Sequence, residues 1–235
     1  GTHSILRKRI SSFTDALLNG VPAIAGLDSS IIIDPRRMHF TLGVMALNDH
    51  SDLSVSAALE LLNSLKADIL QILNEGADAD GEPSSQKLLP LRIPLDTLGI
   101  LKPEKEGGGN VLWVGPDVSS IPRLIYRVFR ERGFIVETRP LKLHCTLINT
   151  SYRRPRARIP FAYDAILCSN ALKDISAVSS AALPSSHTEL DASSHASVNL
   201  GTWTAKEIQL CVMGSHGPEN EYVSVGRIRL DTAGT

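Results

Sequence analysis

Two tetrapeptides of the same pattern decide how this chain is interpreted: His39-Phe40-Thr41-Leu42 and His144-Cys145-Thr146-Leu147. Each lies in an apolar stretch that predicts a β-strand, 38–47 for the first and 141–149 for the second. Side chains alternate between the two faces of a strand, so the His and Thr of each copy point the same way. The sequence therefore predicts two strands that each present one imidazole and one hydroxyl on a common face.

These side chains suit phosphoryl transfer. An imidazole titrates near neutral pH, so one histidine can accept a proton while the other donates one. Hydroxyls donate hydrogen bonds to the non-bridging oxygens of a phosphodiester, and this positioning needs no metal ion. A single H-x-T is weak evidence, because such a histidine is often an ordinary core residue, but two copies in matching halves are much rarer. We therefore assign catalytic roles to His39, Thr41, His144 and Thr146.

The elements around the two motifs mix helices and strands. Helical spacing of apolar residues predicts helices over 4–19, over 52–73 with Asp49 or Ser51 as N-cap, and a third after Asp117 or Ser119 that ends at Gly133. Further strands are expected near 87–93, 96–101, 110–114, 134–137, 203–213 and 222–230. This order predicts an α+β fold of two similar lobes in a single domain over 1–235. An acidic loop at 74–86 and a flexible Ser/Ala-rich insertion at 174–198 are expected outside the core.

The composition excludes several classes of protein. The chain has 235 residues, 43% of them hydrophobic, with 24 Lys and Arg against 25 Asp and Glu. It can bury a sizeable core, and its balanced charge argues against disorder and against a strongly basic nucleic-acid coat. No apolar run reaches the roughly 18 residues of a transmembrane helix, and no secretory signal is expected. Three widely spaced cysteines, Cys145, Cys168 and Cys211, form neither a disulfide framework nor a zinc motif, which predicts reduced thiols in a cytoplasmic or nuclear protein.

The paired motif and its flanks resemble the 2H phosphoesterase superfamily. Gly26-Leu27-Asp28-Ser29-Ser30-Ile31 followed by Pro35-Arg36-Arg37-Met38-His39 is similar to the LigT-like phosphoesterase domains of the kind found in activating signal cointegrator 1 complex subunit 1 and in the centre of A-kinase anchor protein 7. Leu141–His144 followed by Asn149–Arg153 resembles the same domains, as do the closing segments at 201–211 and 222–230. The resemblance covers most of the chain outside the two loops.

The resemblance implies two α+β lobes with antiparallel sheets around a central water-filled cleft. It also implies hydrolysis of 2',3'-cyclic phosphates, or of 2'-5' phosphodiester links, in RNA ends, short oligonucleotides or nucleotides, with no cofactor and no metal. The family's catalytic positions carry over to His39, Thr41, His144 and Thr146, all intact, with His144 favoured as the base and His39 as the acid. A protein complex of the cointegrator type is a further expected partner.

Other residues carry weaker expectations. Arg37 shares strand parity with His39 and Tyr152 with His144, so we expect Arg37 to meet a phosphate and Tyr152 to stack on a base, against the alternative of ordinary surface residues. The basic run at 153–158 is interpreted as a solvated loop, and Trp113 and Trp203 as core. His50, His187, His195 and His216 are expected to face solvent. A non-catalytic module that binds nucleotides or RNA ends remains an alternative from another class.

Overall fold

The chain folds into two compact units that are each built from three separate stretches of sequence. The computed structural model describes residues 3–48, 52–75, 90–101, 103–104, 107–116, 120–176 and 195–230. Unit 1 consists of Gly1–His39, Pro94–Asp117 and His144–Thr202, and unit 2 of Phe40–Ile93, Val118–Leu143 and Trp203–Thr235. Both units combine helices with antiparallel strands, so the α+β prediction is confirmed. In the described part of the chain, no helix is long and apolar enough to cross a membrane.

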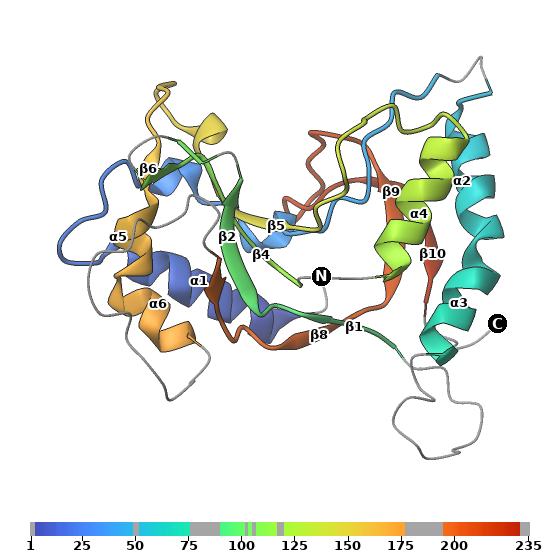
Figure 1. Cartoon of the computed structure of the whole chain (residues 1–235). Helices are drawn as coiled ribbons and strands as arrows, with labels where there is room; N and C mark the ends of the chain where they lie inside the picture. The colour runs from blue at the N-terminus through green and yellow to red at the C-terminus, as the bar shows by residue number, and fades with distance from the viewer. Residues whose placement is uncertain are drawn as a thin grey trace. The chain divides into compact units, whose positions relative to one another are not determined.

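Unit 1 is organised around an antiparallel sheet with the strand order β5-β4-β2-β7. Its strands are β2 (Thr97–Leu101), β4 (Val111–Gly115), β5 (Cys145–Asn149) and β7 (Ala196–Ser197). Leu98, Leu112 and Val114 from the two central strands are fully buried. Figure 1 shows the helices of this unit beside the sheet: α1 (Ser4–Leu18), α5 (Tyr163–Leu167) and α6 (Asn170–Ile175). The predicted first helix is therefore confirmed, and it buries Ile10, Phe13 and Leu17.

Short elements connect the strands of unit 1. Strands β3 (Gly108–Gly109) and β6 (Phe161–Ala162) pair with each other. Three single turns of 3-10 helix, η1 (Ser29–Ile31), η2 (Pro35–Arg37) and η5 (Thr150–Tyr152), each follow an Asp or Asn. In each case the side chain of that residue, Asp28, Asp34 or Asn149, accepts a hydrogen bond from the backbone N–H two residues ahead. Such short polar side chains mimic a backbone turn, which explains why the chain bends at these points.

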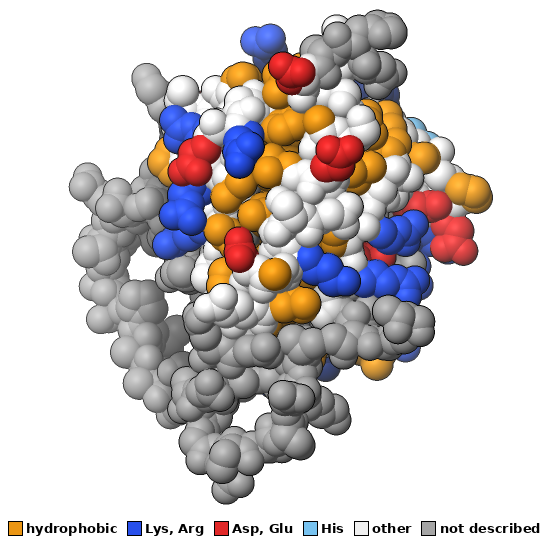
Figure 2. Space-filling model, turned by 90° about the vertical axis from the view of Figure 1, so that its right-hand side faces the viewer, with side chains coloured by type: hydrophobic (Ala, Val, Ile, Leu, Met, Phe, Trp, Pro, Cys, Tyr) orange, Lys and Arg blue, Asp and Glu red, His pale blue; other side chains and the backbone are white. Residues whose placement is uncertain are grey.

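Unit 2 buries its core between three helices and a pair of strands. The helices are α2 (Val55–Ser64), α3 (Lys66–Glu75) and α4 (Ser120–Glu131), and the strands are β1 (Leu91–Pro94), β8 (Thr202–Ala205), β9 (Glu207–Cys211) and β10 (Ser224–Arg229). Strand β9 pairs with β10, and β1 pairs with β8. The helices lie to one side of the β9–β10 pair (Figure 1), and Leu62, Ile69, Ile125 and Ile228 meet in the core between them. Figure 2 shows the outer side of these helices, where hydrophobic side chains are surrounded by basic and acidic ones.

The second predicted helix, over 52–73, is two helices. Leu65 ends α2 with φ −80° and ψ −4°, and α3 begins at the next residue. Leu65 is itself buried, as are Leu62 and Ile69 on either side of it. The turn thus keeps the apolar residues of both helices on one core. The N-cap also differs, because the hydroxyl of Ser54 accepts the Ala57 N–H at 3.2 Å in place of the predicted Asp49 or Ser51.

Several predicted strands were wrong or too long. Residues 38–47 contain one bridge residue, Phe40, and residues 134–137 contain no strand, although Leu42, Phe134 and Ile135 pack on the core of unit 2. The apolar residues in these two stretches pack against the core, but apart from the bridge at Phe40 their backbone does not pair with a neighbouring strand. The predicted strand over 141–149 begins only at Cys145, and the one over 203–213 is interrupted at Lys206.

The two predicted loops fall largely on residues 76–89 and 177–194, which lie outside the described residues. Both predictions began too early, because Glu75 still belongs to α3 and Ile175 to α6, and the second also extended too far at its C-terminal end. Ala196 and Ser197 form β7, which pairs with Leu98 and Thr97, and Val198 is 1% exposed. The Ser/Ala composition hid this re-entry because small residues fit an edge strand as well as they fit a loop.

Candidate active site

The second H-x-T motif lies at the start of β5. His144 directly precedes the strand, and the next three residues begin it. Cys145 and Leu147 are 3% and 0% exposed, whereas His144 and Thr146 are half-buried. The structure therefore has the alternation that the sequence predicted here, with the imidazole and the hydroxyl directed away from the core that Cys145 and Leu147 enter.

A tryptophan lies beside this motif on the same sheet. Trp113 in β4 is the register partner of Thr146, and residues directly opposite in an antiparallel pair share a face. Its ring is 3% exposed and meets the ring of His195 edge-on, with centroids 5.3 Å apart. A Cβ on Gly99 would lie 2.5 Å from His195 Cδ2 and 2.8 Å from Trp113 Cζ2, so only glycine fits there. Trp113 is thus a core residue, as predicted.

The other histidines only partly match the prediction that they face solvent. His195 is exposed as a residue, but its ring packs edge-on against that of Trp113. His216 is exposed and pairs through Nδ1 with Asn220 Oδ1 at 2.6 Å in the turn between β9 and β10. His50 and His187 lie outside the described residues.

The first motif begins at an exposed histidine. His39 Nδ1 lies 2.7 Å from the backbone carbonyl oxygen of Arg37. A carbonyl oxygen can only accept, so Nδ1 carries the hydrogen, and the neutral ring then has its basic lone pair on Nε2. This contact fixes both the orientation and the tautomer of the imidazole.

His39 also contacts the second motif. Burial raises the pKa of the Cys145 thiol from 9.0 to about 12, and a hydrogen bond from the backbone N–H of His39 acts against that rise. The thiol is therefore neutral at physiological pH, which argues against Cys145 as a nucleophile. The contact places the backbone of His39 next to the residue that follows His144, and both histidines belong to unit 1.

The segment that leads to His39 runs along β5. Ile32 forms an isolated antiparallel bridge with Ile148, and the Ile33 N–H donates to the Leu147 carbonyl oxygen at 2.9 Å. The residues before His39 are therefore hydrogen-bonded to the strand that carries Thr146. The two resembling flanks quoted from the sequence are neighbours in the structure.

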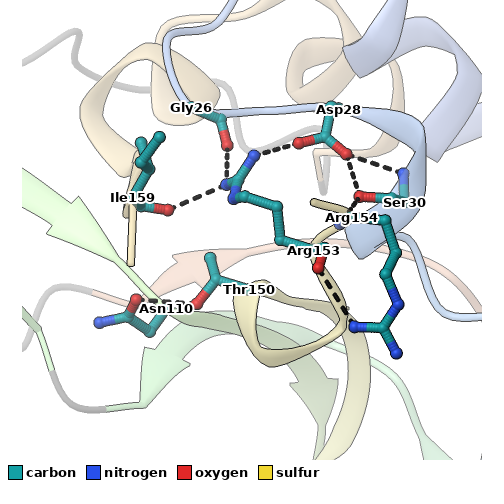
Figure 3. Close-up of polar contacts among 8 residues, drawn as sticks. All are labelled: Gly26, Asp28, Ser30, Asn110, Thr150, Arg153, Arg154 and Ile159. Carbon is teal, nitrogen blue, oxygen red and sulfur yellow. Dashed lines mark hydrogen bonds and ion pairs between the residues drawn. The ribbon is translucent and has the colours of Figure 1, made fainter. Parts of the chain in front are cut away.

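A buried arginine joins these two flanks at their other end (Figure 3). Arg153 is 7% exposed, and its Nη1 donates to the carboxylate of Asp28. Its Nη2 donates to the carbonyl oxygens of Gly26 at 2.6 Å and Ile159 at 2.9 Å. The prediction of a solvated basic loop was therefore wrong for Arg153, because a guanidinium with three acceptors can be buried where a free one cannot.

The Asp28 carboxylate has a second donor. It accepts hydrogen bonds from both the backbone N–H, at 2.8 Å, and the hydroxyl of Ser30. The Ser30 hydroxyl holds the pKa of Asp28 below its ordinary value of 3.8; burial opposes this, while the Ser30 N–H and Arg153 add to it. The Ser30 hydroxyl also accepts the Arg154 N–H at 3.0 Å. Asp28 is therefore a carboxylate at neutral pH, held from both flanks.

The two residues predicted to bind substrate, Arg37 and Tyr152, do not lie in strands. Arg37 is half-buried in the turn η2, and Tyr152 is 45% exposed in η5, beyond the end of β5. Strand parity with His39 or His144 does not extend through a helical turn, so it places neither side chain. Thr41 is half-buried and belongs to unit 2, where the residue after it, Leu42, packs on the core. The structure described for this chain contains no group of three His, Cys, Asp or Glu side chains able to hold a metal ion.

Comparison with known proteins assigns the chain to a class. A family model described as "AKAP7 2'5' RNA ligase-like domain" matches residues 2–230. The chain therefore belongs to the 2H phosphoesterase superfamily, in the family of AKAP7 2'5' RNA ligase-like domains. The resemblance inferred from the paired motifs and their flanks is thus confirmed.

Individual relatives share little sequence identity with this chain. Activating signal cointegrator 1 complex subunit 1 of Mus musculus is 24% identical over 150 residues, which cover 63% of this chain and 40% of that protein's length. Among solved structures, E. coli LigT in complex with 3'-AMP is 12% identical, with 96% of this chain and 91% of that chain covered and a TM-score of 0.45. A structure described as a phosphoesterase is 13% identical, with 97% and 92% covered and a TM-score of 0.46.

Proposed function

We propose that this protein is a metal-independent phosphoesterase that hydrolyses 2',3'-cyclic phosphates at RNA ends or on nucleotides. Membership of the superfamily supports phosphoesterase chemistry in general. The observation that carries the proposal is the pairing of the segment before His39 with β5 within unit 1, through the Ile32–Ile148 bridge and the Ile33–Leu147 hydrogen bond. Acid–base catalysis by two imidazoles needs both of them at one phosphate.

The proposed reaction uses both histidines. His144 accepts a proton from a water molecule whose oxygen attacks phosphorus, and the bond from phosphorus to one ribose oxygen breaks. His39 donates a proton from Nε2 to that leaving oxygen. The carbonyl of Arg37 supports this role, because its hydrogen bond with Nδ1 holds the ring and leaves Nε2 as the nitrogen that exchanges the proton.

The hydroxyls and the remaining residues complete the proposal. Thr146, on the same side of β5 as His144, donates a hydrogen bond to a non-bridging phosphate oxygen, where negative charge accumulates in the transition state. Thr41 is assigned the same task on the strength of its motif alone. Arg37 is proposed to bind phosphate and Tyr152 to stack on a base. The proposal includes a cytoplasmic or nuclear location and a protein complex of the cointegrator type.

A substrate panel tests the proposal directly. Purified protein is incubated with 2',3'-cyclic nucleotides, cyclic-phosphate RNA ends and 2'-5'-linked oligonucleotides, with and without EDTA, and the products are identified by chromatography and ³¹P NMR. We expect ring opening that persists in EDTA and a bell-shaped pH–rate profile. Loss of activity in EDTA that a divalent ion restores would reject the metal-free mechanism.

Two alternatives are tested by the same panel. Cleavage of 2'-5' links is favoured by the description of the matching family model, and it predicts turnover of the linked oligonucleotides with little opening of cyclic phosphates. A non-catalytic module for nucleotides or RNA ends is favoured by the mouse relative, whose name makes it a subunit of a complex. That alternative predicts tight binding with no product at high protein concentration.

A further inference from the structure

We infer that Asp28 and Arg153 form a positioning pair, which holds the segment ending in His39 against the strand of His144 and Thr146. The catalytic consequence of this inference rests on the proposed function, but its structural content does not. The two side chains come from the two flanks that meet beside β5, and their ion pair joins those flanks (Figure 3). Along the sequence this pair lies at the end of each flank that is remote from its histidine.

The segment from Asp28 to His39 needs to be fixed at its end because it lacks a continuous ladder of backbone hydrogen bonds to β5. Between Asp28 and His39 the chain makes the turns η1 and η2, and only Ile32 forms a β-bridge to β5. The Ile33 N–H donates to the Leu147 carbonyl oxygen, and the backbone N–H of His39 contacts the Cys145 thiol. A segment without a continuous ladder opens more easily than a strand inside a sheet unless its end is fixed.

The pair is built for geometry more than for stability. The Arg153 side chain is 9% exposed and that of Asp28 39%, and the Nε of Arg153 is buried without a hydrogen-bond partner. Desolvation of the buried guanidinium offsets much of its attraction to the carboxylate, and apolar replacements of buried ion pairs are often equally stable or more so. A pair that is partly unsatisfied yet present therefore suggests that the fixed orientation of its groups matters.

The acceptors of Arg153 define that orientation. They are the backbone carbonyl oxygens of Gly26 and Ile159 and the side-chain carboxylate of Asp28, so the planar guanidinium binds two backbone positions and one side chain at once. Gly26 has φ +71°, and a Cβ there would lie 2.0 Å from the Pro160 carbonyl oxygen, so this crossing has no room to adjust. A lysine has neither the fork nor the reach to satisfy the same acceptors.

The first test compares turnover with stability. We would measure kcat and KM for a 2',3'-cyclic nucleotide with Asp28→Asn and Arg153→Lys, each at the same interval below its own Tm. We expect kcat to fall about 30- to 100-fold with KM changed less than about threefold, because misplacement of reacting groups by about 1 Å can have an effect of that size. His144→Ala serves as the inactive reference.

Two controls separate positioning from general destabilisation. Leu62→Ala removes a buried side chain from the core of unit 2, far along the chain from both flanks, and is expected to lower Tm while kcat stays within about twofold. Glu137→Gln neutralises the carboxylate of the exposed Arg139 pair and is expected to change neither quantity. If Asp28→Asn lowers kcat no more than Leu62→Ala does, the inference is wrong.

A second measurement is independent of any substrate. The Ile33 amide reports whether the segment stays on β5, and its hydrogen exchange is followed by NMR. We expect Asp28→Asn to speed this exchange about 100-fold relative to amides of the β2–β4 ladder, and Leu62→Ala to leave that ratio unchanged. If Asp28→Asn fails to fold, Ser30→Ala removes the hydroxyl that donates to Asp28 and accepts the Arg154 N–H, and it is expected to raise the ratio several-fold.

The outcomes distinguish the two proposals. Suppose that wild-type protein turns over no phosphoester, while Asp28→Asn raises the exchange rate of the Ile33 amide relative to the β2–β4 amides. The proposed function then fails, and the positioning pair stands. If turnover is found but the Ile33 ratio is unchanged in both Asp28→Asn and Ser30→Ala, the pair does not hold the segment and the inference is overturned.

Discussion

The two copies of the H-x-T pattern differ in the backbone that carries them. The second copy enters β5, which is paired along its length with β4, and its residues alternate between buried and half-buried. The first copy has a single bridge residue, Phe40, and starts at an exposed histidine. One copy is therefore positioned by a sheet, and the other by individual contacts to Arg37 and Cys145. Equal sequence patterns can thus be held in place by different means.

The largest expected effect tests whether both copies are catalytic despite this difference. His144→Ala and His39→Ala should each lower kcat by about 10³-fold, within the range for loss of a general acid or base. The double variant should be little worse than either single one, because residues that act as a unit are not additive. Steady-state kinetics on a cyclic nucleotide measures this. Full turnover by either variant would remove that histidine from the mechanism.

The second-largest expected difference is in how much each copy of the motif contributes to the stability of the protein. Leu147 is fully buried in β5, so Leu147→Ala should lower the free energy of unfolding by about 3 kcal/mol. Leu42 is only half-buried, so Leu42→Ala should lower it by about half as much. Urea titration followed by circular dichroism gives both values. Equal losses would mean that the first copy is as firmly packed as the second.

The hydroxyls are expected to have smaller effects on rate. Thr146→Val and Thr41→Val keep the shape of the side chain and remove one hydrogen bond to a charged phosphate, which is worth roughly 1.5–3 kcal/mol. We therefore expect kcat/KM to fall at least about tenfold for each. A loss with Thr146→Val alone would show that only the copy in the sheet contributes its hydroxyl.

The smallest change concerns the residue between His and Thr. Cys145, with its pKa of about 12, should resist a thiol reagent at pH 8, while the exposed Cys168 reacts. The rate at Cys145 should rise as pH increases towards 12, because the thiolate is the reactive form. A Phe40→Cys variant places a thiol at the matching site of the first copy, and it should react faster than Cys145 because Phe40 is only half-buried. Peptide mapping by mass spectrometry distinguishes the sites.

The sequence predicted the features that depend on local spacing. The first helix, the burial of Cys145 and Leu147, and the family were all readable from residue patterns. The backbone state of 38–47 was not, because an apolar alternation looks the same with or without strand partners. The split at Leu65 was also missed, since both halves keep one apolar face.

The contact between Asp28 and Arg153 had no sequence signal of its own. The aspartate precedes two serines, and the arginine stands among other arginines that are exposed. Only the pairing of β5 with the segment before His39 brings the two together across 125 positions of sequence. A sequence of this length offers many such oppositely charged pairs, and spacing alone does not choose among them.

The interleaving of the two units restricts how this protein can be divided or recombined. The polypeptide passes between units at 39/40, 93/94, 117/118, 143/144 and 202/203. A truncation at 93/94, 117/118 or 143/144 discards pieces of both units whichever end is removed, and removal of 1–39 or of 203–235 leaves one unit incomplete. Gene shuffling with a relative likewise needs five coordinated crossovers to exchange one unit intact, and point substitutions are the natural route for these halves to diverge.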